Sequence, residues 1–588
     1  MKTLRVALCQ LNTVVGDIDG NTKKICQTLA EAEDAGCCLA VFPELAICGY
    51  PPEDLLMKNR FIRDTTAALE KIAAQTSSCF AIVGFPSRLE DSEHRLLKNS
   101  AAVCGNGKIL TVIDKTHLPN YAVFDEHRYF SEGQPCEPVE INTKSGSVKV
   151  GVTICEDLWI DDGAVAQIVD FGAEVVININ ASPYHLSKWS RRQHLLESRS
   201  KEYGIPFVYV NQVGGQDELV FDGQSMVYDS SGGLLARCPQ FCEAVQIVDV
   251  PVGSVDVSVG SVDAPVASQN PQPYPITPLL EPLAEIYEAL KLGTSDYIAK
   301  NGFSDVCVGL SGGIDSSLVA TIAADAVGPS RVHGVLMPSR YSSDHSLSDA
   351  KQLCINLGID YRIMPIEPAH QALLDMLHES LSNDLGDLGL TEENLQSRIR
   401  GIVLMALANH QGWLNLTTGN KSESAVGYST LYGDTAGAFA VIKDVWKQQV
   451  YALAQWRNAQ LDSQADAQPD SQPAQPPIPP NVLTKAPSAE LRPNQRDDET
   501  LPPYDVLDPI LFALVEQDLT AGDMSESGYD PVLVARISKL IDTAEYKRRQ
   551  NPPGIRITRK AFGKDRRMPI THKYLGIARS EEKDSQQT

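Results

Sequence analysis

The second half of this chain is organised around residues 306–320, VCVGLSGGIDSSLVA. The apolar run Val306 to Leu310 is typical of a buried parallel strand, the glycine pair that follows predicts a tight turn, and a helix is predicted to begin near Asp315. Glycines let backbone N–H groups approach an anion, and the unpaired amides of a helix start favour negative charge. A plain glycine-rich turn without a ligand is the alternative, but such a turn has no need of three hydroxyls and an Asp.

The lysine of the common nucleotide loop G-x-x-x-x-G-K-[ST] is missing from this stretch. A loop of hydroxyls, glycines and one Asp suits a pyrophosphate that departs with a metal ion held by the carboxylate. The Ser-Gly-Gly-x-Asp-Ser-Ser pattern resembles the signature of the N-type ATP pyrophosphatases. That resemblance implies cleavage of ATP between its α and β phosphates.

Composition excludes several classes of protein. The 588 residues predict more than one domain. A net charge of −24 argues against nucleic acid or an anionic membrane as partner, and no apolar run is long enough to span a bilayer. Arg5 interrupts the first apolar run, which predicts a strand and not a signal peptide. The 13 scattered cysteines indicate reduced thiols and a cytoplasmic location.

Three predicted strands of the first half each end on one reactive side chain. These are Glu44 after the strand 38–42, Lys115 after 109–113 and Cys155 after 148–154. Strand ends followed by long loops are where sheet proteins place chemistry. The three residue types fit one mechanism: a thiolate nucleophile, a carboxylate general base, and an ammonium that stabilises a tetrahedral intermediate. Taken singly, each is more often an ordinary core or surface residue.

The segments FPEL (42–45), DKTHLP (114–119) and ICEDLW (154–159) resemble the three catalytic segments of the nitrilase, or carbon–nitrogen hydrolase, family. The resemblance covers about residues 3–250. It implies an α-β-β-α sandwich, an amidase acting through the three residues above, and pairing of subunits into a homo-oligomer. It also implies that glutamine is held by Tyr121, Glu156, Ser182 and Lys188.

Strands and helices alternate across about residues 306–420, which predicts a doubly wound parallel sheet with its site at the carboxyl ends of the strands. The expected organisation is a first domain at 1–263, a Pro- and Gln-rich linker at 264–280, and a second domain at 281–580. Residues 461–480 are expected to be a disordered insertion, and residues 581–588 a polar tail. The predicted fold class is therefore α/β, a nitrilase sandwich followed by an ATP pyrophosphatase domain.

The run TGNKSE (418–423) resembles the second signature of the NAD synthetases, as do residues 396–400 and 443–447. The resemblance implies that ATP contacts Leu310, Ser311, Gly312, Gly313, Asp315, Ser316, Ser317, Met337, Arg398, Thr418 and Lys447. It implies that deamido-NAD contacts Arg400, Glu423, Asp434, Lys443 and Lys547, and that Asp315 and Glu423 hold Mg²⁺. Hard oxygen ligands suit Mg²⁺, and Arg and Lys suit polyphosphate. Residues 485–508 resemble the family segment that closes over the substrate.

Taken together, the two halves resemble the glutamine-dependent NAD synthetase family over nearly the whole chain. That resemblance implies ATP-dependent amidation of deamido-NAD with ammonia from glutamine, giving NAD, AMP, pyrophosphate and glutamate. Two alternatives stay open at this point. One is an amidotransferase of the same type that acts on another adenylated carboxylate, and the other is a catalytically inactive nucleotide-binding scaffold.

Overall fold

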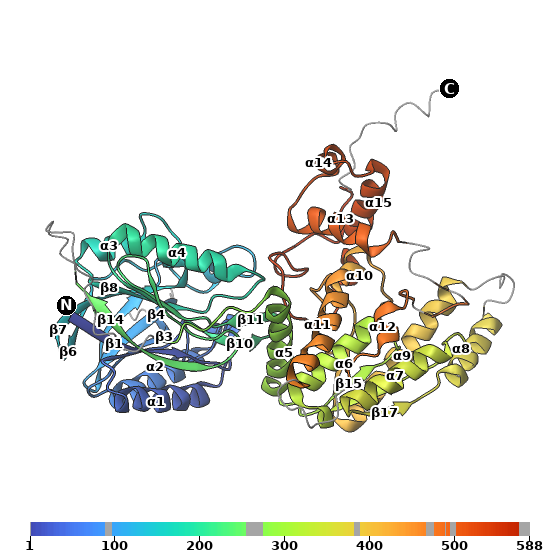
Figure 1. Cartoon of the computed structure of the whole chain (residues 1–588), viewed down its shortest axis with the longest axis horizontal. Helices are drawn as coiled ribbons and strands as arrows, with labels where there is room; N and C mark the ends of the chain where they lie inside the picture. Colours follow the sequence, from blue (N-terminus) through green and yellow to red (C-terminus); the bar gives the residue numbers. More distant parts are fainter. Residues whose placement is uncertain are drawn as a thin grey trace. The chain divides into compact units, whose positions relative to one another are not determined.

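The computed structural model describes residues 2–88, 97–253, 274–380, 389–465, 475–488, 490–493, 495 and 501–574. The chain forms two compact units, Met1–Pro282 and Leu283–Thr588, which are drawn in blue to green and in green to red in Figure 1. In the part of the chain so described, no helix is long and apolar enough to cross a membrane.

The first unit is a sandwich of two six-stranded sheets (Figure 1). One sheet has the order β14 (Ala244–Val252), β1 (Lys2–Gln10), β2 (Leu39–Val41), β3 (Phe80–Arg88), β4 (Leu97–Gly105), β5 (Lys108–Asp114). The other has the order β13 (Leu234–Arg237), β12 (Met226–Tyr228), β9 (Phe207–Asn211), β8 (Val175–Asn180), β7 (Gly146–Ile154), β6 (Val139–Thr143). A separate pair joins β10 (Val213–Gln216) to β11 (Leu219–Asp222).

Two helix layers cover the outer faces of this sandwich. α1 (Ile18–Asp34) and α2 (Asn59–Gln75) lie on the first sheet, and α3 (Ala164–Asp170) and α4 (Lys188–Tyr203) on the second. The alternation along β1 explains the layering: Leu4, Val6 and Leu8 join the core between the sheets, whereas Ala7 and Cys9 pack under the helices. The α-β-β-α sandwich predicted from the sequence is confirmed.

The second unit contains a five-stranded sheet in which every pair is parallel. Its order is β17 (Asp360–Ile363), β16 (Val332–Leu336), β15 (Val306–Gly309), β18 (Leu414–Thr417), β19 (Phe439–Ala440). The chain runs outward from β15 to β17 and then returns to the other side of β15. The turn after β15 and the loop after β18 therefore meet at the switch point, where such sheets bind ligands. The predicted parallel sheet is confirmed.

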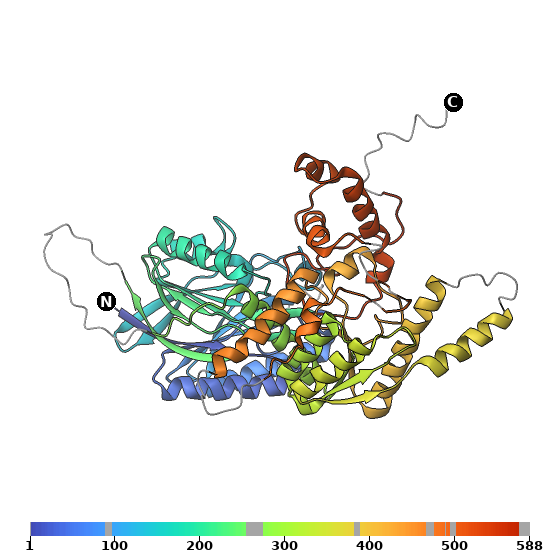
Figure 2. The same ribbon diagram turned by 45° about the vertical axis from the view of Figure 1, so that its right-hand side comes forward.

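Helices connect and surround these strands. They are α5 (Pro282–Lys300), α6 (Ile314–Val327), α7 (Asp344–Leu357), α8 (Glu367–Ser380), α9 (Leu390–Gln411), α10 (Lys421–Val426), α11 (Lys447–Ala465), α12 (Pro480–Thr484) and α16 (Glu545–Arg548). Three more, α13 (Tyr504–Glu516), α14 (Ala521–Glu526) and α15 (Pro531–Thr543), share an apolar core with α10. Figure 2 shows these three, coloured orange to red, gathered apart from the parallel sheet.

Two segments expected to be irregular are partly ordered. In the expected linker, residues 274–280 lie along β13, where Thr277 N–H donates to the Arg237 carbonyl at 3.1 Å. In the expected insertion, α11 continues to Ala465. Ile478 is fully buried, and the Asn458 side chain bonds both its N–H and its carbonyl. Residues 254–273, 466–474 and 581–588 lie outside the described residues.

A buried ammonium joins α10 to the helices that follow the sheet. Lys421 Nζ lies 2.8 Å from Asp444 and 2.9 Å from Glu516, and it donates to Thr558 Oγ1 at 2.6 Å. All three charged side chains are less than one-tenth exposed. Losing one partner of such a group is costly, because the others stay buried without compensation.

We therefore expect Lys421→Met to lower the free energy of unfolding of the second unit by about 3–5 kcal/mol. Lys539→Met on the exposed face of α15 is the matched control and should change it by less than about 0.5 kcal/mol. Urea titration followed by far-ultraviolet circular dichroism measures both. Equal stability of the two variants would contradict the structural role of Lys421.

Candidate active sites

Cys155 lies at the carboxyl end of β7, where the chain turns into a short 3-10 helix, Cys155–Leu158. Its φ is +45°, a left-handed conformation that is unusual for a residue with a side chain and is often retained at functional sites. Asp157 fixes this elbow, since it accepts the Ile154 N–H at 3.0 Å with one oxygen. Its other oxygen accepts the Thr116 N–H at 3.0 Å and hydroxyl at 2.6 Å. The strand end that carries Lys115 is thereby tied to the elbow of Cys155.

Lys115 forms a buried ion-pair network beside that elbow. Its Nζ lies 2.7 Å from Glu44 Oε1 and 2.9 Å from both oxygens of Glu126. Asn99 Nδ2 donates to Glu44 Oε1 at 2.7 Å, and the Ala181 N–H donates to Glu44 Oε2 at 2.9 Å. Burial acts to lower the pKa of Lys115, but the two carboxylates outweigh it, so the pKa lies well above its usual value and the ammonium keeps its charge.

Glu126 is a member of this network that the sequence analysis missed. It lies in a three-residue 3-10 turn, Glu126–Arg128, where no strand end or periodic pattern marks it. Tyr50 OH donates to Glu126 Oε1 at 2.9 Å, so the carboxylate is held from two sides. Burial raises the pKa of Glu126 and the adjacent ammonium opposes that rise.

The charges of Glu44 and Lys115 also act on the pKa of the Cys155 thiol. Burial raises its pKa well above the usual value, the charge of Glu44 raises it further, and Lys115 opposes both. The resting thiol therefore holds its proton, and a base must remove it before sulfur can attack. Glu44 is the carboxylate whose charge acts most strongly on the thiol.

The four predicted glutamine contacts fall into two groups. Tyr121 OH donates to both oxygens of Glu156 at 3.1 Å, and the ammonium of Lys188 acts electrostatically on Glu156. Tyr121 is 56% exposed, so this group can meet an incoming ligand. Ser182 is buried and follows the Ala181 amide that holds Glu44. Arg192, which the sequence analysis did not single out, donates to the Ser182 carbonyl at 3.0 Å and pairs with buried Asp222 at 2.8 Å.

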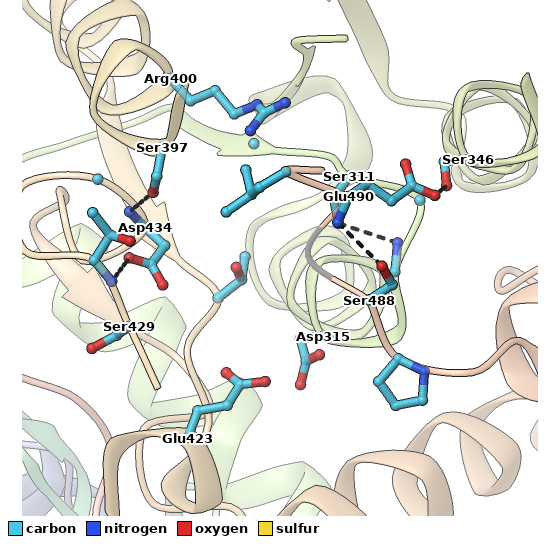
Figure 3. A pocket seen from close by; sticks show the side chains of 18 of the residues that line it. Ser311, Asp315, Ser346, Ser397, Arg400, Glu423, Ser429, Asp434, Ser488 and Glu490 are labelled. Atoms are coloured by element: carbon cyan, nitrogen blue, oxygen red, sulfur yellow. Dashed lines mark hydrogen bonds between the residues drawn. The ribbon is translucent and has the colours of Figure 1, made fainter. Parts of the chain in front are cut away.

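In the second unit, a cavity of about 450 Å³ opens at the switch point of the parallel sheet (Figure 3). Of the predicted site residues, its lining includes Leu310, Ser311, Gly312, Gly313, Asp315, Met337, Arg400, Thr418, Glu423, Asp434, Lys447 and Lys547. Ser316, Ser317, Arg398 and Lys443 are not part of that lining. The structure thus brings twelve of the sixteen predicted residues to one cavity.

The glycine turn follows β15 directly. Gly312 has φ +77°, and a Cβ there would lie 2.2 Å from the Ser346 carbonyl oxygen, so only glycine fits. The two serines at the start of α6 brace the turn, since Ser316 Oγ and Ser317 Oγ donate to the Gly313 carbonyl at 3.1 Å and 2.8 Å. The Ser311 N–H donates to Ser316 Oγ at 3.4 Å and the Gly313 N–H to Ser311 Oγ at 3.2 Å, so these hydroxyls fix the shape of the turn that lines the cavity.

Lys447 bridges the two carboxylates that were predicted as metal ligands. Its Nζ lies 2.5 Å from Asp315 Oδ2 and 3.1 Å from Glu423 Oε1. The remaining Asp315 oxygen accepts Asn420 Nδ2 at 2.8 Å, and Asn420 Oδ1 in turn caps α10 by accepting the Glu423 N–H at 2.9 Å. Asn420 lies inside the motif TGNKSE, but the sequence alone did not reveal its part in holding Asp315.

Two further cations border the cavity. Arg400 Nε donates to the Met337 carbonyl at 3.1 Å, and Figure 3 shows its guanidinium above the hollow. Lys547 Nζ donates to the carbonyls of Gly427 and Ser429, each at 2.7 Å. Burial lowers the pKa of Arg400 to about 10 and lowers that of Lys547. Both groups are therefore poorly solvated cations that an anionic ligand would stabilise.

Asp434 faces the same hollow (Figure 3). Its Oδ1 accepts the Thr430 N–H at 2.6 Å, and its own N–H donates to Ser397 Oγ at 3.1 Å. Withdrawal from bulk solvent raises the pKa of Asp434 to about 6.

The two predicted cations outside the lining hold neighbouring loops. Arg398 Nε donates to the Leu431 carbonyl at 3.2 Å, close in sequence to Asp434. Lys443 Nζ donates to the Pro552 carbonyl at 2.8 Å, close in sequence to Lys547.

Part of the expected closing segment lies against the start of α7. Lys485, Ser488 and Glu490 line the cavity. Glu490 accepts the hydroxyls of Ser343 and Ser346 at 2.9 Å and 2.7 Å, at the start of α7 (Figure 3).

Comparison with known proteins gives matches over both units. A carbon-nitrogen hydrolase family model matches residues 5–257, and an NAD synthase family model matches residues 286–551. The glutamine-dependent NAD(+) synthetase of Thermotoga maritima is 44% identical, with 98% of this chain and 99% of that protein covered. The enzyme of the same description from Aquifex aeolicus is 42% identical, with 97% and 100% covered.

A solved structure agrees with this. The glutamine-dependent NAD+ synthetase of Acinetobacter baumannii, in complex with ADP, is 38% identical and superposes with a TM-score of 0.72, covering 97% of this chain and 98% of that one. Matches of this length and identity favour neither alternative left open by the sequence, another acceptor or an inactive scaffold. The chain belongs to the glutamine-dependent NAD(+) synthetases.

Proposed function

We propose that the two sites divide one reaction between them. The first frees ammonia from glutamine, and the second spends ATP to activate the carboxylate of deamido-NAD for attack by that ammonia. The observation that carries the proposal is that each site holds a buried lysine between two carboxylates, one beside a thiol and the other on a large cavity. The family to which the chain belongs supports the same division.

At the first site, Glu44 takes the proton of the Cys155 thiol, and the sulfur attacks the side-chain amide carbon of glutamine. The ammonium of Lys115 stabilises the negative charge that develops on the amide oxygen. Glu44 returns the proton to nitrogen, ammonia leaves, and water activated by Glu44 hydrolyses the thioester to glutamate. Glutamine is held by Tyr121, Glu156, Ser182 and Lys188.

At the second site, the nicotinate carboxylate of deamido-NAD attacks the α-phosphate of ATP. The pyrophosphate leaves into the turn formed by residues 311–317, and ammonia then attacks the adenylated acyl group to give NAD and AMP. ATP is contacted by Leu310, Met337 and Thr418, and its phosphates are bound by Lys447. Arg400, Asp434 and Lys547 border deamido-NAD. Arg398 and Lys443 act on these sites through the loops they hold.

Asp315 and Glu423 fit a divalent cation by donor chemistry, because both present hard carboxylate oxygens to the same cavity. Mg²⁺ bound there with ATP would neutralise charge that builds on the departing pyrophosphate. Asn420 and Lys447 orient Asp315 toward the hollow.

The proposal also includes a cytoplasmic setting and a homo-oligomer. All 13 cysteines are free, which suits a reducing compartment.

Ile402, Met405 and Tyr432 are exposed around a shallow hollow, an apolar surface that a second copy of this chain could cover. Light scattering on the purified protein measures the oligomeric state directly.

The division of labour is tested by Cys155→Ala. Glutamine-supported NAD formation should fall by about 1,000-fold or more, because no other thiol can form the acyl-enzyme, while ammonia-supported formation stays within about twofold. Cys242→Ala, at an exposed position, is the control and should leave both rates unchanged. Equal loss with both nitrogen donors would sink the proposal.

A reciprocal result is expected for Asp315→Asn. Because the change removes one of two anionic ligands, NAD formation should fall by about 100-fold or more with either nitrogen donor, and saturation should need far more Mg²⁺. Hydrolysis of glutamine to glutamate should persist. Binding of Mn²⁺ in the presence of ATP, followed by paramagnetic resonance, reports the cation independently of turnover. Unaltered cation affinity would exclude Asp315 as a ligand.

Asp434 gives a pH-dependent prediction. The pyridinium ring of deamido-NAD carries a fixed positive charge, so an ionised Asp434 attracts it and a protonated one does not. Since the pKa of Asp434 is about 6, affinity for deamido-NAD should fall about tenfold as the pH drops from 7.5 to 5. In Asp434→Asn the affinity should be low and independent of pH over that range. Calorimetric titration measures this, and a variant that keeps the wild-type slope would assign the titration to another group.

A further inference from the structure

Asn99 lies in β4 beside the catalytic carboxylate of the first site. It pairs with Pro86 on β3, its backbone carbonyl accepts the Lys115 N–H at 2.8 Å, and its side chain is buried. Its Nδ2 donates to Glu44 Oε1 at 2.7 Å, the same oxygen that accepts Lys115 Nζ. No role in the reaction has been assigned above to this residue.

The orientation of this amide is fixed by chemistry. The two oxygens of Glu44 receive the Lys115 ammonium, the Ala181 N–H and the Asn99 side chain. A carboxylate that is held by an ammonium and a backbone N–H acts as an acceptor, so the NH₂ group of Asn99 and not its carbonyl must face it. The Asn99 carbonyl oxygen therefore points elsewhere.

That carbonyl oxygen is buried and has no hydrogen-bond donor in the part of the chain that the structure describes. A buried acceptor without a donor costs free energy, and most such groups in folded proteins are satisfied. An asparagine is not needed merely to hold Glu44 in place. An apolar side chain at this position, together with Lys115 and the Ala181 N–H, would restrain the carboxylate without leaving an acceptor unpaired. The arrangement fits a donor that arrives with the substrate.

The reaction supplies an N–H donor at this place. Glu44 passes its proton to the nitrogen that leaves glutamine, so the nitrogen must lie next to Glu44 when the bond breaks. We propose that Asn99 Oδ1 accepts a hydrogen bond from this leaving nitrogen, both as the –NH₂ group of the bound amide and as the departing ammonia. Asn99 thus joins the base and the leaving group through the two ends of one side chain.

Every bond that forms in this step is matched by one that breaks. The bond from Cys155 Sγ to the amide carbon forms, the carbon–nitrogen bond breaks, and the thiol proton moves through Glu44 to nitrogen, which leaves as NH₃. Asn99 donates and accepts hydrogen bonds and exchanges no proton. The inference rests on the proposed function of Glu44, Lys115 and Cys155.

The test compares two leaving groups in the full-length enzyme. Asn99→Leu keeps the volume of the side chain and removes both hydrogen bonds. We expect kcat/KM for glutamine to fall about 100-fold, and kcat/KM for the γ-methyl ester of glutamate, whose leaving group has no N–H, to fall only about tenfold through the loosened Glu44. The amide-to-ester ratio therefore drops about tenfold. Asn99→Ala repeats the measurement should the leucine variant fold poorly.

Ser100→Ala is the matched control in the same strand, since Ser100 Oγ bonds Asp114 and touches none of the three catalytic side chains. It should leave the ratio unchanged. Equal losses for amide and ester in the Asn99 variants would reduce Asn99 to a positioning residue for Glu44 and overturn the inference, as would no loss with either substrate. A Cys155→Ala enzyme that still hydrolyses glutamine would instead overturn the proposed site, whatever Asn99 does.

Discussion

A buried ammonium between two carboxylates is the interaction on which this structure most depends, and it occurs three times among the residues that the structure describes. Lys115 lies between Glu44 and Glu126, Lys447 between Asp315 and Glu423, and Lys421 between Asp444 and Glu516. For Lys115 and Lys447 the negative partners outweigh the desolvation of the lysine, so the pKa of each ammonium lies well above its usual value. Each trio also carries one negative charge in excess.

The neighbours of each trio differ, and they distinguish the trio that stabilises the fold from the two at the proposed sites. Around Lys421, the excess charge is satisfied internally: Asp444 accepts the backbone N–H groups of Ile557 and Thr558, and Glu516 accepts Trp446 Nε1. The other two trios also have internal donors, such as Asn99 and the Ala181 N–H on Glu44 and Asn420 on Asp315, but each has a reactive neighbour besides. Beside Lys115 it is the Cys155 thiol, and beside Lys447 it is the cavity. A carboxylate beside such a neighbour can take a proton from the thiol or bind a cation from the cavity.

How much of this the sequence predicted depends on whether a local rule applied. Glu44, Lys115 and Cys155 were singled out because each ends a strand, although the strand of Cys155 belongs to the other sheet. Glu126 was missed because it sits in an isolated turn, and Asn99 because a polar residue within a strand carries no periodic signal. α4 escaped prediction for a related reason. Its buried face includes Arg192, Arg199 and Ser200, so no apolar stripe marks it.

The second unit shows the limit of motif reasoning at the level of single side chains. The signature SGGxDSS located the turn, but two of its hydroxyls brace the Gly313 carbonyl and do not line the cavity. A motif shows which residues a site contains. Which of them line the cavity and which brace the backbone depends on the φ angles and neighbours of each residue. Net charge has the same limit. The −24 of the whole chain argues against a broad anionic partner, yet Arg400, Lys447 and Lys547 all line one cavity.

Burial at the first site also bears on the form in which nitrogen is released. Ammonia exposed to neutral water takes up a proton and loses its nucleophilic lone pair. Asn99, Glu44 and Lys115 are all buried, and a low-dielectric setting disfavours the charged form of any amine that lacks a carboxylate of its own. Lys115 already occupies the carboxylates of Glu44 and Glu126. In the proposed reaction the nitrogen leaves beside carboxylates that the lysine ammonium already holds, which favours its release as neutral ammonia able to attack an acyl group.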